Sequence, residues 1–132
     1  MEIVGSLADF FDAAFADLAC DEKTRAYLAN LFSTFRTNHN DLSNQSLTLL
    51  YIKAKEKQDF VSYQSLADYI FFASAIFPES LSDASDDYYI TIGQLSYYSC
   101  YKLLNRQWHL YECLSDQFAP LSTEARTLIR SL

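Results

Sequence analysis

The sequence contains little glycine and little proline. Its 132 residues include two of each, against about nine and about seven at average usage. All-β sandwiches need many tight turns, and those turns depend on glycine and proline, so this scarcity argues against that class. Helices joined by polar loops need few such residues. We therefore predict an all-α fold, a single-domain helical bundle of about six to seven helices over residues 1–132.

Positive charge is also scarce. Ten Lys and Arg face 17 Asp and Glu, which gives a formal net charge of -7. This charge repels nucleic-acid phosphates and anionic membrane surfaces, so we expect neither as a partner. The run Lys53-Ala-Lys55-Glu-Lys57 is short and interrupted by a glutamate, and a solvated helix end explains it best.

Long apolar segments are missing as well. The longest apolar run, from Tyr69 to Phe77, is less than half as long as the roughly 20 residues that a membrane span needs. The N-terminal residues include Glu2 and Asp9 and no early Lys or Arg, which is not the pattern of a secretory signal. We expect a buried core helix at the apolar run and no membrane association.

Cysteine and histidine are too few for most catalytic or metal-binding patterns. Cys20, Cys100 and Cys113 form no Cys-x-x-Cys pair, which is typical of a protein in a reducing cytoplasm. His109 and Cys113 are spaced for one helical face, where a thiol–imidazole pair or half of a metal site could form, but packing at the core edge is the favoured interpretation. No phosphate-binding glycine loop, nucleophile elbow or calcium loop occurs. We expect no catalytic residue, no metal site and no cofactor.

Hydrophobic periodicity and capping residues place the helices. Ser6 and Asp21 are expected to cap the first two helices, and Pro78 to stop the fourth. The expected ranges are about 6–18, 22–37, 44–57, 60–76, 86–105, 107–118 (a continuation or a sixth helix) and 123–130. The fourth and fifth are expected to form the centre.

The position of Asp68 has two interpretations. Ser65-Leu-Ala-Asp68 repeats the opening Ser6-Leu-Ala-Asp9, so Ser65 could cap a helix and leave Asp68 exposed. If the helix instead starts near Phe60, Asp68 lies inside an apolar helix and needs a partner. Helical spacing favours the longer helix, and a tyrosine hydroxyl is the expected partner.

The stretch from Asp86 to Tyr101 carries five tyrosines around Gly93. The favoured interpretation is a central helix whose glycine lets a neighbour, expected to be the fourth helix, come close. The alternative is an aromatic pocket for a small apolar or aromatic ligand, anchored by Asp68. Its candidate ligand-binding residues are Asp68, Phe71, Phe77, Tyr88, Tyr89 and Tyr97.

Four segments occur in this order: Thr24-Arg-Ala-Tyr-Leu-Ala-Asn-Leu-Phe, residues 65–79, Asp87-Tyr-Tyr-Ile-Thr-Ile-Gly and Tyr111-Glu-Cys-Leu-Ser-Asp-Gln-Phe. Together they resemble a group of small uncharacterised bacterial proteins that look all-helical. The expected pattern has Leu-Gly-Asp where this chain has Leu66-Ala67-Asp68, and Ser-Gly-Phe-Phe where it has Ser74-Ala75-Ile76-Phe77. The two alanines are departures from that pattern. The resemblance covers about residues 20–120 and implies a bacterial, cytoplasmic, single-domain helical protein, but supplies no activity.

Two functions follow as hypotheses. A heavy aromatic load on a small acidic domain without a catalytic signature favours a non-catalytic cytoplasmic interaction or adaptor protein. Its partner would be another protein or a second copy in a homodimer. The alternative is a small-molecule-binding protein, or an enzyme built on one, with its aromatic pocket around Asp68 and the tyrosines of residues 86–105.

Overall fold

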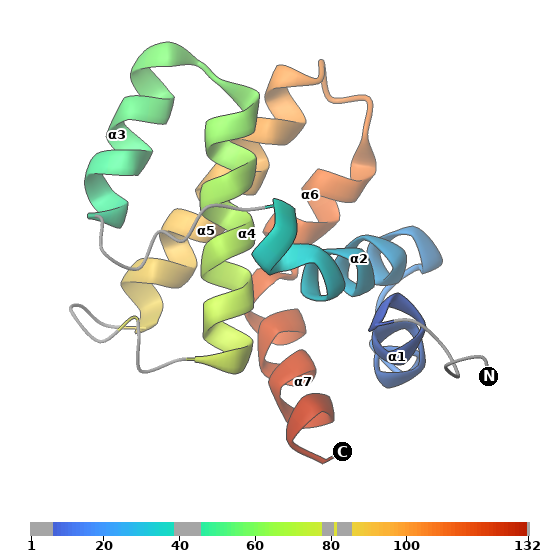
Figure 1. Ribbon diagram of the computed structural model, residues 1–132. Coiled ribbons are helices and arrows are strands. Elements are labelled where there is room, and N and C mark those ends of the chain that lie inside the picture. The colour runs from blue at the N-terminus through green and yellow to red at the C-terminus, as the bar shows by residue number, and fades with distance from the viewer. Residues whose placement is uncertain (1–6, 39–45, 78–80, 82–85, 132) are drawn as a thin grey trace.

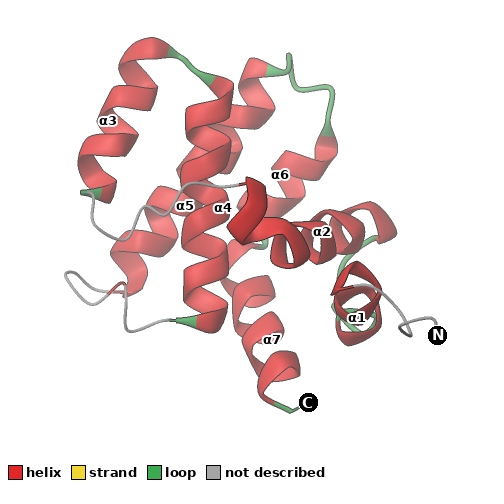
Figure 2. Cartoon of the chain, in the orientation of Figure 1, coloured by secondary structure: helices red, strands yellow, loops and turns green. Residues whose placement is uncertain are grey.

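The computed structural model describes residues 7–38, 46–77, 81 and 86–131, and over these ranges the chain is an all-α bundle with no strand. In Figure 2 the described residues appear as helices and loops, without a strand. The predicted fold class is therefore confirmed. The helices are α1 (Leu7–Ala14), α2 (Glu22–Asn38), α3 (Leu47–Lys57), α4 (Phe60–Ile76), α5 (Asp86–Leu103), α6 (His109–Asp116) and α7 (Phe118–Arg130).

The helix α4 lies at the centre of the bundle. It packs against α2, α3, α5 and α7, and ten of its 17 residues are buried. Figure 1 shows α3 on one side of α4, α5 behind it and α7 below. The helix α5 packs against α4 and α6. The expectation that the fourth helix lies at the centre is confirmed, and it follows from its apolar residues on nearly all sides. The fifth helix packs along it but exposes one face, at Asp87, Thr91, Leu95 and Lys102.

The start of α4 is set by Asp59. Its carboxylate accepts hydrogen bonds from the Val61 amide at 3.2 Å and the Ser62 hydroxyl at 2.5 Å, as an N-cap residue does. The helix therefore begins before Ser65. The longer-helix interpretation is confirmed, and Asp68 lies inside α4. The expected cap Ser6 lies outside the described residues.

On the C-terminal side, a separate sixth helix is confirmed as the right alternative, and the expected start of the last helix is wrong. Residues 107–118 do not continue α5, because Asn105 and Arg106 both adopt a φ of 58°, a left-handed conformation that breaks the helix. The last helix begins at Phe118 rather than Thr123 and contains Pro120 in its first turn. Proline is tolerated there because the first amides of a helix have no intrahelical acceptor.

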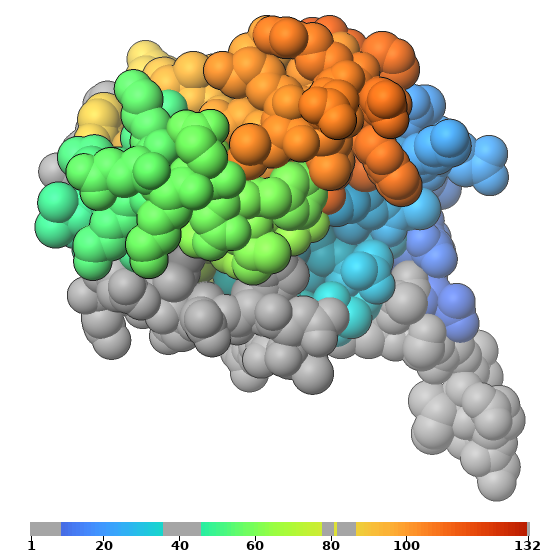
Figure 3. All heavy atoms as spheres, turned by 90° about the horizontal axis from the view of Figure 1, so that it is seen from above, coloured from blue at the N-terminus to red at the C-terminus, as the bar shows by residue number. Residues whose placement is uncertain are grey.

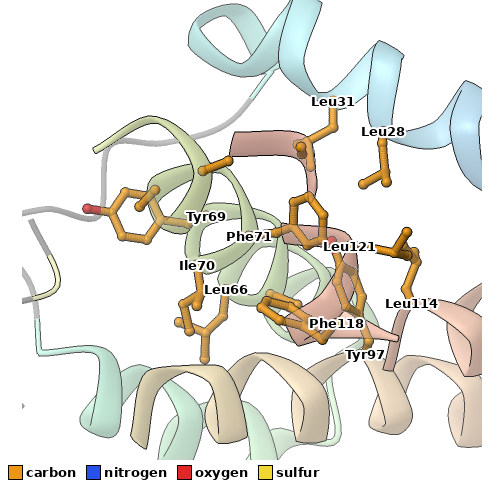
Figure 4. Packing of buried hydrophobic residues seen from close by; sticks show 14 of the residues in the cluster. Leu28, Leu31, Leu66, Tyr69, Ile70, Phe71, Tyr97, Leu114, Phe118 and Leu121 are labelled. Carbon is orange, nitrogen blue, oxygen red and sulfur yellow. The ribbon is translucent and has the colours of Figure 1, made fainter. Parts of the chain in front are cut away.

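Gly93 has a different neighbour from the one expected. A Cβ atom added there would lie 2.5 Å from Cζ of Phe118, so the missing side chain makes room for an α7 ring rather than for α4. Figure 4 shows Phe118, Phe71 and Tyr97 together in the core. The Phe118 ring centroid lies 5.2 Å from that of Phe71 and 5.7 Å from that of Tyr97. The glycine thus lets three helices share one aromatic cluster.

Among the described residues, no helix has the length and apolar character needed to cross a bilayer.

Candidate functional sites

Asp68 is the central polar residue of the core. It is 2% exposed, and its Oδ1 atom accepts hydrogen bonds from the hydroxyls of Tyr97 at 2.6 Å and Tyr27 at 2.8 Å. The predicted pairing of a buried Asp68 with a tyrosine is confirmed. Tyr27, from α2, was not among the predicted site residues. A buried carboxylate needs such donors, because burial without hydrogen bonds is costly.

Gln64 extends these contacts to α6. It lies one turn before Asp68 on α4, and its Nε2 donates to the Tyr111 hydroxyl at 2.9 Å and the Tyr27 hydroxyl at 3.4 Å. The Tyr27 ring also meets those of Tyr97 and Tyr111 edge-on, at 6.4 and 5.7 Å between centroids. We call Tyr27, Gln64, Asp68, Tyr97 and Tyr111 the Asp68 network. It connects α2, α4, α5 and α6.

Tyr27 and Tyr97 donate to Asp68 as neutral phenols. Burial, and then the charge of Asp68, raise the pKa of both Tyr27 and Tyr97 above the usual tyrosine range. Burial likewise raises the pKa of the nearby Cys100 thiol, whereas a nucleophilic cysteine needs a lowered pKa. The chemistry of this cluster is that of a structural hydrogen-bond network.

A small depression of about 230 Å³ lies beside Asp68, between α2 and α4. None of the five aromatic residues predicted to surround Asp68 lines it. Phe71 and Tyr97 are fully buried in the core. The lining consists of Tyr27, Asn30, Leu31, Val61, Gln64, Ser65 and Asp68.

The other predicted site residues lie elsewhere. Phe77 is 47% exposed at the end of α4, where its ring packs on Phe72. Tyr88 and Tyr89 pack edge-on against each other at the start of α5, and the Tyr88 hydroxyl is hydrogen-bonded to Thr48 of α3. The structure therefore brings Tyr97 to Asp68 and places Tyr88 at the α3–α5 contact.

His109 and Cys113, which the sequence places on one helical face, are not part of a group of metal ligands among the described residues. The exposed His109 directs Nδ1 to the Glu112 carboxylate at 3.1 Å. Within the described part of the chain, no three His, Cys, Asp or Glu side chains are grouped as a metal site would require.

A larger surface feature lies between α3 and α5. The two helices run side by side in the same direction (Figure 1), with the Thr48–Tyr88 hydrogen bond where both begin. Toward their ends they enclose a groove of about 380 Å³, within the range of roughly 300–1,000 Å³ typical of ligand sites. We call it the α3–α5 groove. Its lining consists of Tyr51, Lys55, Gln58, Tyr63, Leu95, Tyr98, Ser99, Lys102 and Leu103.

Aromatic and aliphatic side chains form much of this groove. The rings of Tyr51 and the buried Tyr63 meet edge-on at 6.0 Å. Leu95, on the opposite wall, is 44% exposed. Figure 3 shows the molecule from the top of Figure 1, and on this surface the green atoms of α3 and α4 adjoin the orange atoms of α5 and α6. The groove thus offers apolar surface to solvent.

The rim of the groove is basic. Lys55 stands on the α3 wall, and the Lys102 Nζ atom lies 5.3 Å from the centre of the Tyr98 ring on the α5 wall. A hydrogen bond to Tyr98 raises the pKa of Arg106, just beyond α5. The described residues that line the groove include no Asp or Glu. On a chain of net charge -7, this is a local reversal of sign.

In comparisons with known proteins, no family model, curated protein or solved structure matches the chain. The bacterial family suggested by sequence resemblance stays a prediction. Function is therefore argued from the geometry of the groove and of the Asp68 network.

Proposed function

We propose that this chain is a non-catalytic interaction or adaptor protein that binds a protein partner at the α3–α5 groove. The observation that carries the proposal is the groove itself, with the half-exposed Leu95 above a floor of tyrosine rings. Exposed apolar surface rimmed by polar residues is typical of partner surfaces. Aromatic residues are also favoured at the centres of such interfaces.

The polar residues of the core support a non-catalytic role. A catalytic site needs a nucleophile, or an acid and a base, that can reach a substrate. Tyr97, by contrast, is fully buried and its hydroxyl donates a hydrogen bond to Asp68, and Gln64 donates one to Tyr111. These groups are engaged with one another.

Small-molecule binding at Asp68 is the second candidate, and the depression beside this carboxylate favours it. It has less support than the groove, since Oδ1 of Asp68 already accepts two hydrogen bonds. A ligand there would compete with Tyr27 and Tyr97 for that oxygen, which adds a cost to binding.

The proposed setting is a bacterial cytoplasm. Cys20, Cys100 and Cys113 are free thiols, and a reducing compartment preserves such thiols.

Affinity capture with matched variants tests the proposed function. The tagged chain, a Leu95→Glu variant and a Leu49→Glu variant are each used to capture proteins from an extract of the source cells. Leu49 is 56% exposed on α3 but does not line the groove, so its variant controls for a new surface charge. We expect a stoichiometric partner that Leu95→Glu loses and Leu49→Glu retains.

The opposite pattern would contradict the proposal. If Leu95→Glu abolishes the binding of no protein, and of no second copy of the chain, the groove is not a partner surface. Native mass spectrometry of the same preparations tests the second candidate. A monomer that carries a reproducible small extra mass, lost in an Asp68→Asn variant that remains folded, would favour small-molecule binding.

A further inference from the structure

We infer that the partner presents an acidic amphipathic helix to the α3–α5 groove, with its apolar face against Leu95 and its carboxylates against Lys55 and Lys102. This inference rests on the proposed function and names the chemistry of the partner.

The charge of the groove is the first part of the argument. Its two walls each carry a lysine, and the described lining residues include no carboxylate. Arg106 adds a third cation at the Tyr98 end of the rim. Charge complementarity across an interface favours the right partner and penalises a basic one. The rest of this acidic chain repels an extended polyanion such as nucleic acid, so a short acidic segment fits better.

The shape of the groove is the second part. Along α5 the lining residues Leu95, Ser99 and Lys102 follow helical spacing, so this wall presents one face over about two turns, or roughly 11 Å. On the other wall Tyr51 and Lys55 lie one turn apart on α3, and Gln58 follows just past the helix end. A third helix laid between two parallel helices, with apolar residues at every third or fourth position, matches this arrangement.

A symmetric dimer through this groove is disfavoured by the same charges. In a two-fold interface the same surface patch serves on both subunits. Two groove linings that each carry two lysines and no carboxylate would then be brought together. Like charges brought together at an interface are unfavourable. The lysines therefore favour a different, acidic partner over a second copy of the groove.

Lysines near helix ends also have a simpler role. The C-terminal ends of α3 and α5 carry Lys55, Lys57 and Lys102. A positive charge there is stabilised by the partial negative charge at the C-terminal end of the helix dipole. Lys53 and Lys57 do not line the groove, whereas Lys55 and Lys102 do. This difference supplies a matched control, because the double variants K55E/K102E and K53E/K57E change the net charge equally.

A displayed library of amphipathic helical peptides tests the inference. The apolar face of the library is fixed as leucine and phenylalanine, and the flanking positions vary among Glu, Gln and Lys. After selection against the full-length chain, the affinities of enriched peptides are measured by fluorescence anisotropy, and circular dichroism checks that each variant is folded. We expect Glu-flanked peptides whose Kd rises at least tenfold with K55E/K102E and less than threefold with K53E/K57E. Lys-flanked versions should bind K55E/K102E better than they bind the unmodified chain.

Three outcomes would overturn the inference: no enriched helix, enrichment without acidic flanks, or equal losses in the two double variants. These outcomes are distinguishable from failure of the proposed function. If capture shows a partner that depends on Leu95 but presents a loop or a basic helix, the function stands and the inference fails. If no partner depends on Leu95, the function itself fails.

Discussion

Replacing Asp68 tests whether the buried polar network holds the bundle together. In an Asp68→Ala variant, the hydroxyls of Tyr97 and Tyr27 lose their acceptor. Each buried donor left unpaired costs about 1–3 kcal/mol. Part of the sum is recovered because a buried carboxylate is removed. We therefore expect the free energy of unfolding to fall by about 3 kcal/mol.

Two further variants separate charge from hydrogen bonding. Asp68→Asn keeps a carbonyl oxygen in the place of Oδ1 and should lose only about 1 kcal/mol, since the phenols keep a neutral acceptor. Asp12→Ala, at an exposed position of α1, should change stability by less than about 0.5 kcal/mol. Urea denaturation followed by circular dichroism gives the free energies, with an unchanged slope as the sign that the unfolding transition is the same.

A double-mutant cycle with Tyr97→Phe makes this prediction refutable. Because Asp68 and Tyr97 share a hydrogen bond of 2.6 Å, the double variant should be less destabilised than the sum of the single variants, by about 1 kcal/mol or more. Additive losses would show that the two residues are not energetically coupled. A loss below about 0.5 kcal/mol for Asp68→Ala would show that the network contributes no more than a surface site.

Three further predictions follow from the core. Burial raises the pKa of Tyr27 and Tyr97 in the folded state, so the unfolded chain releases these protons first as pH rises. The free energy of unfolding should then fall above about pH 10, by roughly 1.4 kcal/mol per pH unit for each phenol. Urea denaturation at several alkaline pH values measures this fall, which should be shallower in the Tyr97→Phe variant. Gly93→Ala places a Cβ atom 2.5 Å from Phe118. Thermal unfolding should therefore show a loss of about 1–3 kcal/mol in the free energy of unfolding, despite alanine's better helix propensity. An additional Phe118→Leu change should restore part of that free energy. The Ser96 hydroxyl is buried without a hydrogen-bond partner among the described residues, so Ser96→Ala should stabilise the chain by about 1 kcal/mol, and a loss instead would indicate a hydrogen bond to that hydroxyl.

Local signals predicted the fold well where they were strong. The bounds of α4 could be predicted because helical spacing runs without interruption from Phe60 and because Pro78 disfavours helical geometry at Phe77, directly after the last helical residue. The start of α7 could not, since Pro120 marks a boundary in most contexts but is tolerated in the first turn of a helix. The neighbour of Gly93 was also missed. A small residue predicts a close approach without saying which element makes it.

The candidate sites depended more on tertiary packing. The pairing of Asp68 with a tyrosine could be predicted, because a charged residue inside an apolar helix needs a donor. The identity of Tyr27 as a second donor could not, since it requires the placement of α2 against α4. The groove has the same limitation. Lys55 and Lys102 are distant in sequence, and only the parallel packing of α3 and α5 places them on opposite walls.

Site-specific photo-crosslinking tests the central claim, that the α3–α5 groove binds a protein, most directly. A benzophenone amino acid is placed at Leu95, in the groove, and in a second variant at Leu49, which is more exposed but lies outside it. Our account predicts that light links a defined protein to position 95 in the source cells, and that the product is much weaker from position 49. A product from position 49 alone, or none from either position, would contradict the claim.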